Sequence, residues 1–196
     1  MQVLVTEEAV LHLDDMTDDQ FFAFCVRNSE YRIERAADGK VIILSGTGGR
    51  TGNRNSDLTA QIHLWARADG RGVAFDSSTL FRLPNGAMRS PDASWVSRQR
   101  LASLSEREKE KYLPLCPEFV VELTSPSDQF PAVAEKMAEW IANGCLLGWI
   151  LDTRQRQVHI YRPSGVEVVQ QAQGLAGDEP VEGLLLELSS IWDPGW

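Results

Sequence analysis

The sequence predicts an α/β fold in which a mixed β-sheet is flanked by helices. Residues 119–123 (FVVEL) form a nearly continuous apolar run, which is typical of a strand covered on both faces. Residues 54–68 and 130–143 carry apolar side chains at helical spacing, so we expect two amphipathic helices packed on the sheet. No internal repeat, low-complexity tract or linker interrupts the sequence. We therefore expect a single domain spanning residues 1–196.

The N-terminal part is expected to add a helix and a hairpin to this sheet. Thr17 to Gln20 (TDDQ) match a capping box, so a helix should follow and end near Asn28. Two strand-like runs within residues 31–44 flank the dipeptide Asp38-Gly39, which favours a turn with positive φ. The hairpin should therefore reverse at this dipeptide.

A stretch rich in glycine and asparagine, residues 47–56 (TGGRTGNRNS), follows the hairpin. It lacks the Lys-Ser/Thr ending of a phosphate-binding loop. We interpret it as a mobile loop over the functional site. Within it, Arg50 and Arg54 are candidates for contacts with the phosphates of a nucleic acid.

The rest of the chain predicts further short strands. Residues 98–117 are polar and charged and should form a solvated helix or loop. Gly144 follows the predicted helix 130–143 and suits its C-terminal end. The segments with strand-like composition are residues 72–76, 79–83, 90–97, 146–152, 157–163, 166–170 and 184–188.

The net charge of −9 argues at first against nucleic acid as a partner. The charge is unevenly distributed, however. Residues 1–20 and 164–196 each hold six acidic residues and no Lys or Arg, which leaves 16 acidic residues against 19 Lys and Arg in residues 21–163. The middle of the chain is therefore mildly basic, and this permits a nucleic-acid-binding surface.

Cysteine and histidine usage bounds the chemistry. The three cysteines are widely spaced without a CxxC motif, and none of the three histidines lies at metal-ligand spacing, which excludes a Cys/His metal cluster. No apolar run is long enough to span a bilayer, and the N-terminus lacks the pattern of a signal peptide. We expect a cytoplasmic protein with reduced thiols and no membrane partner.

Glu122 stands out because it lies inside the apolar run 119–123. An isolated buried carboxylate costs several kcal/mol unless it is paired or protonated, so it normally has a partner or a role. Two structural explanations are open: the carboxylate lies at the end of the strand in contact with water, or it forms an ion pair with an arginine.

Two further ionisable residues complete a candidate site. Asp92 follows a proline and, in a strand, would share a face with Ser94. Lys136 lies on the flank of the apolar face of helix 130–143, from which it could lean over the sheet. An ordinary turn acid and an ordinary solvated lysine are the alternatives.

This combination suits metal-assisted hydrolysis of phosphodiester bonds. Asp92 and Glu122 would hold Mg²⁺ or Mn²⁺ through hard oxygen ligands, and the ion would lower the pKa of a bound water. Lys136 would position that water or stabilise the pentacoordinate phosphate.

The order of these residues resembles the PD-(D/E)XK nuclease superfamily. Pro91-Asp92 is followed thirty residues later by Glu122. In the usual form of the pattern a lysine lies two residues after the second acid, but here that position is Thr124. Some branches of the superfamily carry the lysine on the following helix, and Lys136 matches that arrangement.

Successive blocks resemble the Uma-two family of restriction-endonuclease-like proteins over about residues 15–192. The resemblance implies a restriction-endonuclease-like fold and a divalent-metal nuclease site of Asp92, Glu122 and Lys136, with Glu34 of the first hairpin as a further site carboxylate. The resemblance does not supply a substrate. Phosphodiester hydrolysis leads us to expect nucleic acid, DNA above all, as the partner, and a homodimer would suit a nuclease of this fold, because such nucleases often cut two strands with two copies. The matching blocks are TGGRTGNRNS, FDSSTLFRLPNGAMRSPDASWV, VVELTSPSD, KMAEWIANGCLLGWILD, VHIYRP and LLLELSSIW.

Two classes of function fit these observations best. The first is a Mg²⁺-dependent nuclease that acts on DNA. The second is a catalytically idle module that binds nucleic acid or protein on the same scaffold. An idle descendant is expected to have lost an acid or the lysine, and this chain retains all of them. An acidic structural protein would explain the net charge but not Glu122.

Overall fold

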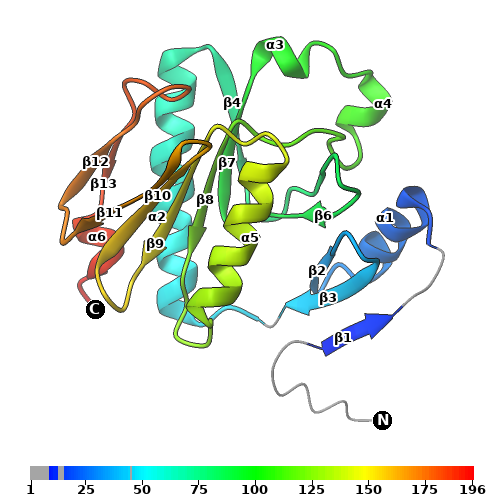
Figure 1. The fold of residues 1–196 in the computed structure, drawn as a ribbon, viewed down its shortest axis with the longest axis horizontal. Coiled ribbons are helices and arrows are strands. Elements are labelled where there is room, and N and C mark those ends of the chain that lie inside the picture. Colours follow the sequence, from blue (N-terminus) through cyan, green and yellow to red (C-terminus); the bar gives the residue numbers. More distant parts are fainter. Residues whose placement is uncertain (1–8, 13–15, 45) are drawn as a thin grey trace.

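The computed structural model describes residues 9–12, 16–44 and 46–196. Its centre is a six-stranded sheet in the order β11-β10-β9-β8-β7-β4 (Figure 1). Neighbouring strands are antiparallel except β8 and β9, which are parallel and are joined by helix α5 (Phe130–Ala142). The strands span Gly72–Asp76 (β4), Ala93–Ser97 (β7), Phe119–Leu123 (β8), Leu147–Asp152 (β9), Gln157–Arg162 (β10) and Gly165–Gln170 (β11).

Two long helices cover opposite faces of this sheet. Helix α2 (Gly49–Asp69) lies behind the sheet in the view of Figure 1 and α5 lies in front of it. Because side chains alternate along a strand, Phe119 and Val121 of β8 join the hydrophobic core under α2, whereas Val120 joins the core under α5. The predicted mixed sheet flanked by helices is confirmed.

A second, smaller sheet contains the predicted hairpin. Its order is β1-β3-β2-β6-β5, and helix α1 (Asp18–Arg27) packs against it through the buried Phe21. The capping box at Thr17 is present, Asn28 is the C-cap residue directly after the helix, and Gly39 has the positive φ that the hairpin turn requires. The strands span Ala9–His12 (β1), Arg32–Arg35 (β2), Lys40–Leu44 (β3), Phe81–Arg82 (β5) and Met88–Arg89 (β6).

The loop predicted over residues 47–56 is wrong, because helix α2 already begins at Gly49. Glycine and asparagine in a helix cost up to about 1 kcal/mol each relative to alanine. Burial of Thr51, Leu58 and Ile62 along the same helix outweighs this cost, since most helical stability in proteins comes from tertiary packing. Arg50 and Arg54 therefore lie in the first turns of a helix.

The remaining elements are short. The polar segment after β7 holds helices α3 (Arg98–Leu101) and α4 (Glu106–Lys109), as expected of a solvated segment. Near the C-terminus, β12 (Gly174–Ala176) pairs with β13 (Leu185–Glu187), and α6 (Ser189–Trp192) packs beside α2. Within the described residues, we find no helix with the length and apolar character needed to cross a membrane.

Candidate active site

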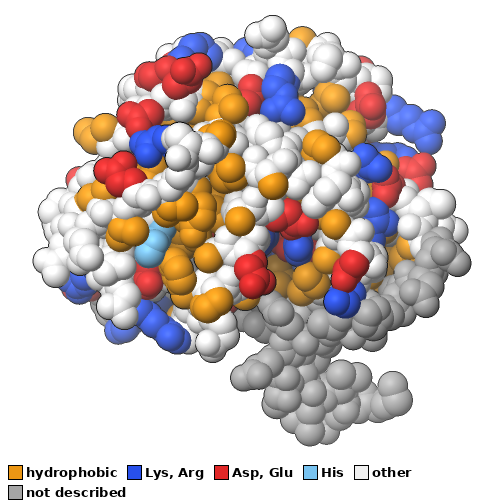
Figure 2. Space-filling view, in the orientation of Figure 1, with side chains coloured by type: hydrophobic (Ala, Val, Ile, Leu, Met, Phe, Trp, Pro, Cys, Tyr) orange, Lys and Arg blue, Asp and Glu red, His pale blue; other side chains and the backbone are white. Residues whose placement is uncertain are grey.

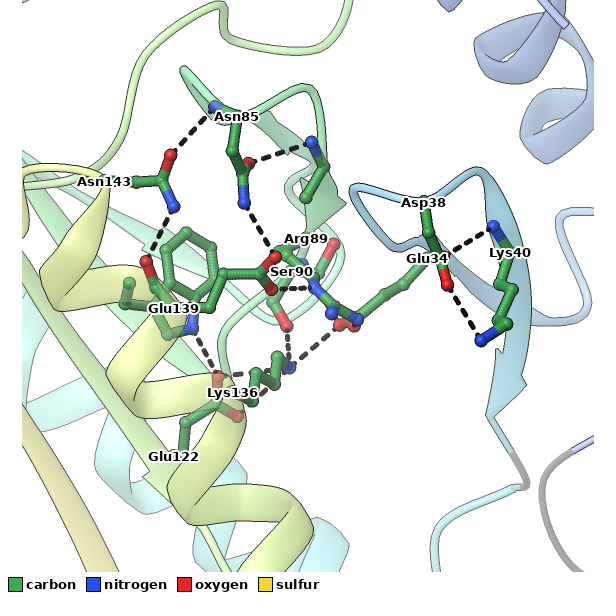
Figure 3. Close-up of polar contacts among 12 residues, drawn as sticks. Glu34, Asp38, Lys40, Asn85, Arg89, Ser90, Glu122, Lys136, Glu139 and Asn143 are labelled. Carbon is green, nitrogen blue, oxygen red and sulfur yellow. Dashed lines mark hydrogen bonds and ion pairs between the residues drawn. The ribbon is translucent and has the colours of Figure 1, made fainter. Parts of the chain in front are cut away.

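The structure brings Glu34, Asp92, Glu122 and Lys136 together on the α5 side of the main sheet. Glu34 comes from β2, Glu122 from β8 and Lys136 from α5, and Asp92 lies directly before β7. Figure 3 shows Lys136 reaching from α5 towards both glutamates. Elements from both sheets therefore meet at one cluster, and Figure 2 shows acidic and basic side chains side by side on this face of the molecule.

Strand register explains why Asp92 and Glu122 are neighbours. Ala93 pairs with Val121 in the antiparallel ladder of β7 and β8, so the preceding Asp92 lies beside Glu122 on the adjacent strand. Asp92 Oδ2 accepts a hydrogen bond of 2.8 Å from the backbone N–H of Leu123. This contact fixes the Asp92 carboxylate against the end of β8.

Lys136 is the centre of the cluster. Its Nζ lies 2.8 Å from Glu34 Oε1, 2.8 Å from the carbonyl oxygen of Ser90 and 3.1 Å from Glu122 Oε1. Only 17% of the side chain is exposed. Burial would lower the pKa of Lys136, but the facing charges of Glu122 and Glu34 outweigh it and raise that pKa above its ordinary value. The amine is therefore a cation at neutral pH.

Glu34 is a fully paired carboxylate. Arg89 Nη1 lies 3.1 Å from its Oε2, and the backbone N–H of Ser90 donates to its Oε1 at 3.2 Å. Burial would raise the pKa of Glu34, yet the charges of Lys136 and Arg89 and these hydrogen bonds lower it below the ordinary value. Glu34 is thus stably ionised in the folded protein.

Glu122 behaves in the opposite way. Burial raises the pKa of Glu122 to about 7, and the negative charges of Asp92 and Glu34 add to the increase. Lys136 and the indole N–H of Trp140, which donates to Glu122 Oε1 at 2.9 Å, only partly offset it. The site therefore contains a carboxylate whose ionisation is unfavourable until more positive charge arrives.

Several residues of the cluster carried no sequence signal. Arg89 links Glu34 to Glu139 of α5, with a contact of 2.6 Å from Arg89 Nε to Glu139 Oε2. Asn85 donates to the other oxygen of Glu139 at 2.9 Å (Figure 3). Trp140 had a recognisable position, since it lies one helical turn after Lys136 and faces the same strand. The partners of Arg89 lie too far away in sequence for a local pattern.

Thr124, at the position where the superfamily pattern usually has lysine, does not contact the cluster. Its hydroxyl donates to the carbonyl of Leu151 and accepts from the backbone N–H of Thr153. It therefore ties the end of β8 to the end of β9.

The two arginines predicted to contact nucleic acid face another part of the chain. Arg54 donates to the backbone carbonyls of Ile191 and Trp192, at 2.7 and 3.1 Å. Arg50 donates to the carbonyl of Trp196 at 3.3 Å. These contacts join the first turns of α2 to the C-terminal segment and not to the carboxylate cluster.

The donor set fits a divalent cation of the hard, oxygen-binding kind. No group of three or more His, Cys, Asp or Glu residues is placed to hold a metal ion within residues 9–12, 16–44 and 46–196. A pair of carboxylates is nevertheless sufficient for Mg²⁺, which keeps several waters and is commonly held by one or two carboxylates together with substrate phosphates. Asp92, directly before β7, and Glu122 of the adjacent strand β8 form such a pair.

Comparisons with known proteins identify the family and the fold of the chain. The Uma2 family, described as "Putative restriction endonuclease", matches residues 18–191. Among solved structures, a putative nuclease belonging to DUF820 from Anabaena variabilis ATCC 29413 is similar with a TM-score of 0.74 and 20% sequence identity, covering 91% of this chain and 98% of that chain. No curated protein matches. Because the family match extends over most of the chain, this protein belongs to the Uma2 (Uma-two) family of restriction-endonuclease-like proteins.

Proposed function

We propose that this protein is a divalent-metal-dependent nuclease that hydrolyses phosphodiester bonds in DNA. One observation carries the proposal: a protonated lysine is held between two buried glutamates, directly beside a third carboxylate. Family membership agrees with this function. A purely structural cluster would gain little from placing Asp92 beside Glu122 where β7 begins and β8 ends, since the repulsion between the two acids destabilises the fold.

Each residue has a distinct role in the proposed reaction. Asp92 and Glu122 would hold Mg²⁺ or Mn²⁺, which when bound lowers the pKa of water and offsets negative charge on the phosphate. Lys136 is protonated and therefore does not act as a general base. Its ammonium group instead stabilises the charge that develops on the pentacoordinate phosphate. Glu34 and the carbonyl of Ser90 hold the amine of Lys136 in position.

Incubation of the purified protein with nucleic acid tests the proposal. Supercoiled, linear and single-stranded DNA and an RNA of the same sequence are incubated with Mg²⁺, Mn²⁺ or EDTA. We expect cleavage of DNA with either metal and none in EDTA. Glu122→Gln should lose cleavage, because the amide cannot provide an anionic ligand. The matched control is Glu135→Gln, which removes the same charge from the exposed side of α5.

Four outcomes would contradict or change the proposal. Cleavage in EDTA, or undiminished cleavage by Glu122→Gln, would contradict it. Metal-independent binding of DNA without any cleavage would favour the idle binding module. Cleavage of RNA alone would make RNA the substrate in place of DNA.

We further propose that two copies act on the two strands of a duplex, which sedimentation of the protein with and without DNA would test.

A further inference from the structure

Arg32 of β2 is loosely bound although it lies at the candidate active site. Its Nη1 is 3.3 Å from Asp92 Oδ1 and its Nη2 is 3.5 Å from the carbonyl oxygen of Ser90. Charge-assisted hydrogen bonds are ordinarily about 2.7–2.9 Å long. The Nε of Arg32 is buried and has no hydrogen-bond partner among the residues that the structure describes. Most of the donors of this guanidinium are therefore poorly used or unused.

Other arginines nearby show what a structural arginine looks like in this protein. Arg89 binds Glu139 at 2.6 Å and Glu34 at 3.1 Å, with 12% of its side chain exposed. Arg35 binds Asp18 and the carbonyls of Met16 and Gly86, with 10% of its side chain exposed. Arg32 is 30% exposed and has only the two long contacts. A purely structural role does not require so loose a placement.

The position of Arg32 is that of a cation beside an expected metal ligand. Asp92 Oδ2 is held by the backbone of Leu123, so Arg32 faces the remaining oxygen, Oδ1. Arg32 and Lys136 also share the carbonyl of Ser90, and each contacts one member of the carboxylate pair: Arg32 contacts Asp92 and Lys136 contacts Glu122. A divalent ion that binds Asp92 through Oδ1 competes with Arg32 for this oxygen.

We propose that Arg32 is an exchangeable counter-charge. It neutralises Asp92 in the metal-free protein and, once a divalent cation binds Asp92, its guanidinium turns to a phosphate oxygen of the nucleic acid. This inference rests on the proposed function. The planar fork of arginine matches phosphate geometry and stays charged at every relevant pH. The exposed fraction of the side chain leaves the guanidinium room to move outwards.

Titration of the full chain with Mn²⁺ alone, followed by calorimetry, tests the first half of the proposal. Arg32→Gln should bind Mn²⁺ about two- to fivefold more tightly than the wild type, because it removes a competitor of ion-pair strength. Arg32→Lys retains the charge and should bind Mn²⁺ within about twofold of the wild type. Arg67→Gln is the control, since it removes one charge from an exposed position of α2, on the opposite face of the sheet.

Binding of a short fluorescent DNA duplex, measured with Ca²⁺ in place of Mg²⁺, tests the second half. Arg32→Gln should weaken this binding about tenfold or more, the effect of losing a hydrogen bond between charged groups. Arg32→Lys should lose less, and Arg67→Gln little. The opposite directions of the two effects are decisive, because a misfolded variant would lose both kinds of binding.

Asp92→Asn separates failure of this inference from failure of the proposed function. If Asp92→Asn binds Mn²⁺ as well as the wild type, the metal site is misassigned and the proposed function fails together with the inference. If Asp92→Asn loses Mn²⁺ binding but Arg32→Gln binds Mn²⁺ no more tightly than the wild type, only the role of Arg32 is overturned. Unchanged binding of DNA by Arg32→Gln would likewise overturn the phosphate contact alone.

Discussion

The two faces of the main sheet use the same strands but bury different kinds of side chain. On the α2 side, Phe119, Val121 and Leu123 of β8 join one hydrophobic cluster. On the α5 side, Val120 lies in a hydrophobic cluster, but the next residue on that face is Glu122. The comparison teaches that one strand can serve stability through one face and a reactive site through the other, because its side chains alternate.

The largest effect is expected from Lys136→Met, on the polar face. The substitution keeps an unbranched side chain, one atom shorter, but leaves Glu34 and Glu122 without their shared cation. Breaking a buried pair in this way costs about 3–5 kcal/mol of unfolding free energy, which urea denaturation measures. Cleavage should also be lost. Lys109→Met breaks an exposed pair with Glu106 and should cost less than about 1 kcal/mol. Equal costs for both variants would show that the buried cluster is not tightly coupled.

On the apolar face, Leu58→Ala should reduce stability without changing the chemistry. Leu58 of α2 is fully buried, and truncation of a buried leucine costs about 2–5 kcal/mol. The folded variant should retain the cleavage rate and the metal response of the wild type. A metal response lost together with stability would mean that the two faces are not independent.

Metal binding at the polar face should stabilise the folded protein. A saturating Mg²⁺ or Mn²⁺ concentration of about 100 times Kd should raise the unfolding free energy by about 2.7 kcal/mol, visible as a higher melting temperature. Asp92→Asn should lose most of this gain, because it removes an anionic ligand. An unchanged gain in Asp92→Asn would place the metal elsewhere.

The smallest effect is expected from Thr124→Ala. The substitution removes the two hydrogen bonds that the Thr124 hydroxyl makes between the ends of β8 and β9, at a cost of about 1 kcal/mol each. Cleavage by the folded variant, measured at a temperature well below melting, should change little. Loss of cleavage would mean that Thr124, and not Lys136 of α5, has the role of the superfamily lysine.

Elements whose ends and faces are determined by neighbouring residues could be predicted from the sequence. The apolar run of β8, the capping box at Thr17 and the helical spacing of α5 each specify an element within a few residues. Glu122 was recognisable because a carboxylate interrupts an apolar strand. The order of Asp92, Glu122 and Lys136 then indicated a site through its resemblance to a known family.

Contacts between distant residues were beyond these patterns. Arg32 and Asp92 are 60 residues apart in sequence, and Arg89 and Glu34 are 55 apart. Strands β5 and β6 have two residues each, so pairing with the hairpin and not strand propensity defines the small sheet. The early start of α2 also depends on contacts with distant residues, because burial against the sheet outweighs the low helix propensity of its glycines and asparagines.

The shifted pKa values of Glu122 and Glu34 make the free energy of unfolding depend on pH. Because the pKa of Glu122 is raised from 4.5 to about 7, its carboxyl group keeps a proton in the native state at pH values between these two, where the unfolded state has released it. Its contribution therefore decreases stability by up to about 1.4 kcal/mol per pH unit as the pH rises from about 4.5 to about 7. The lowered pKa of Glu34 acts in the opposite sense, since its contribution is present above pH 4.5 and is lost as the pH falls through the lowered value.

The free energy of unfolding of Glu122→Gln, measured by urea denaturation at pH 8 in EDTA, tests our claim that Glu122 is kept at a cost to stability because it serves a metal site. We predict that Glu122→Gln is at least as stable as the wild type, while Glu34→Gln, measured alongside it, is clearly less stable. A loss of more than about 1 kcal/mol in Glu122→Gln would contradict the claim and make Glu122 a structural ion-pair residue.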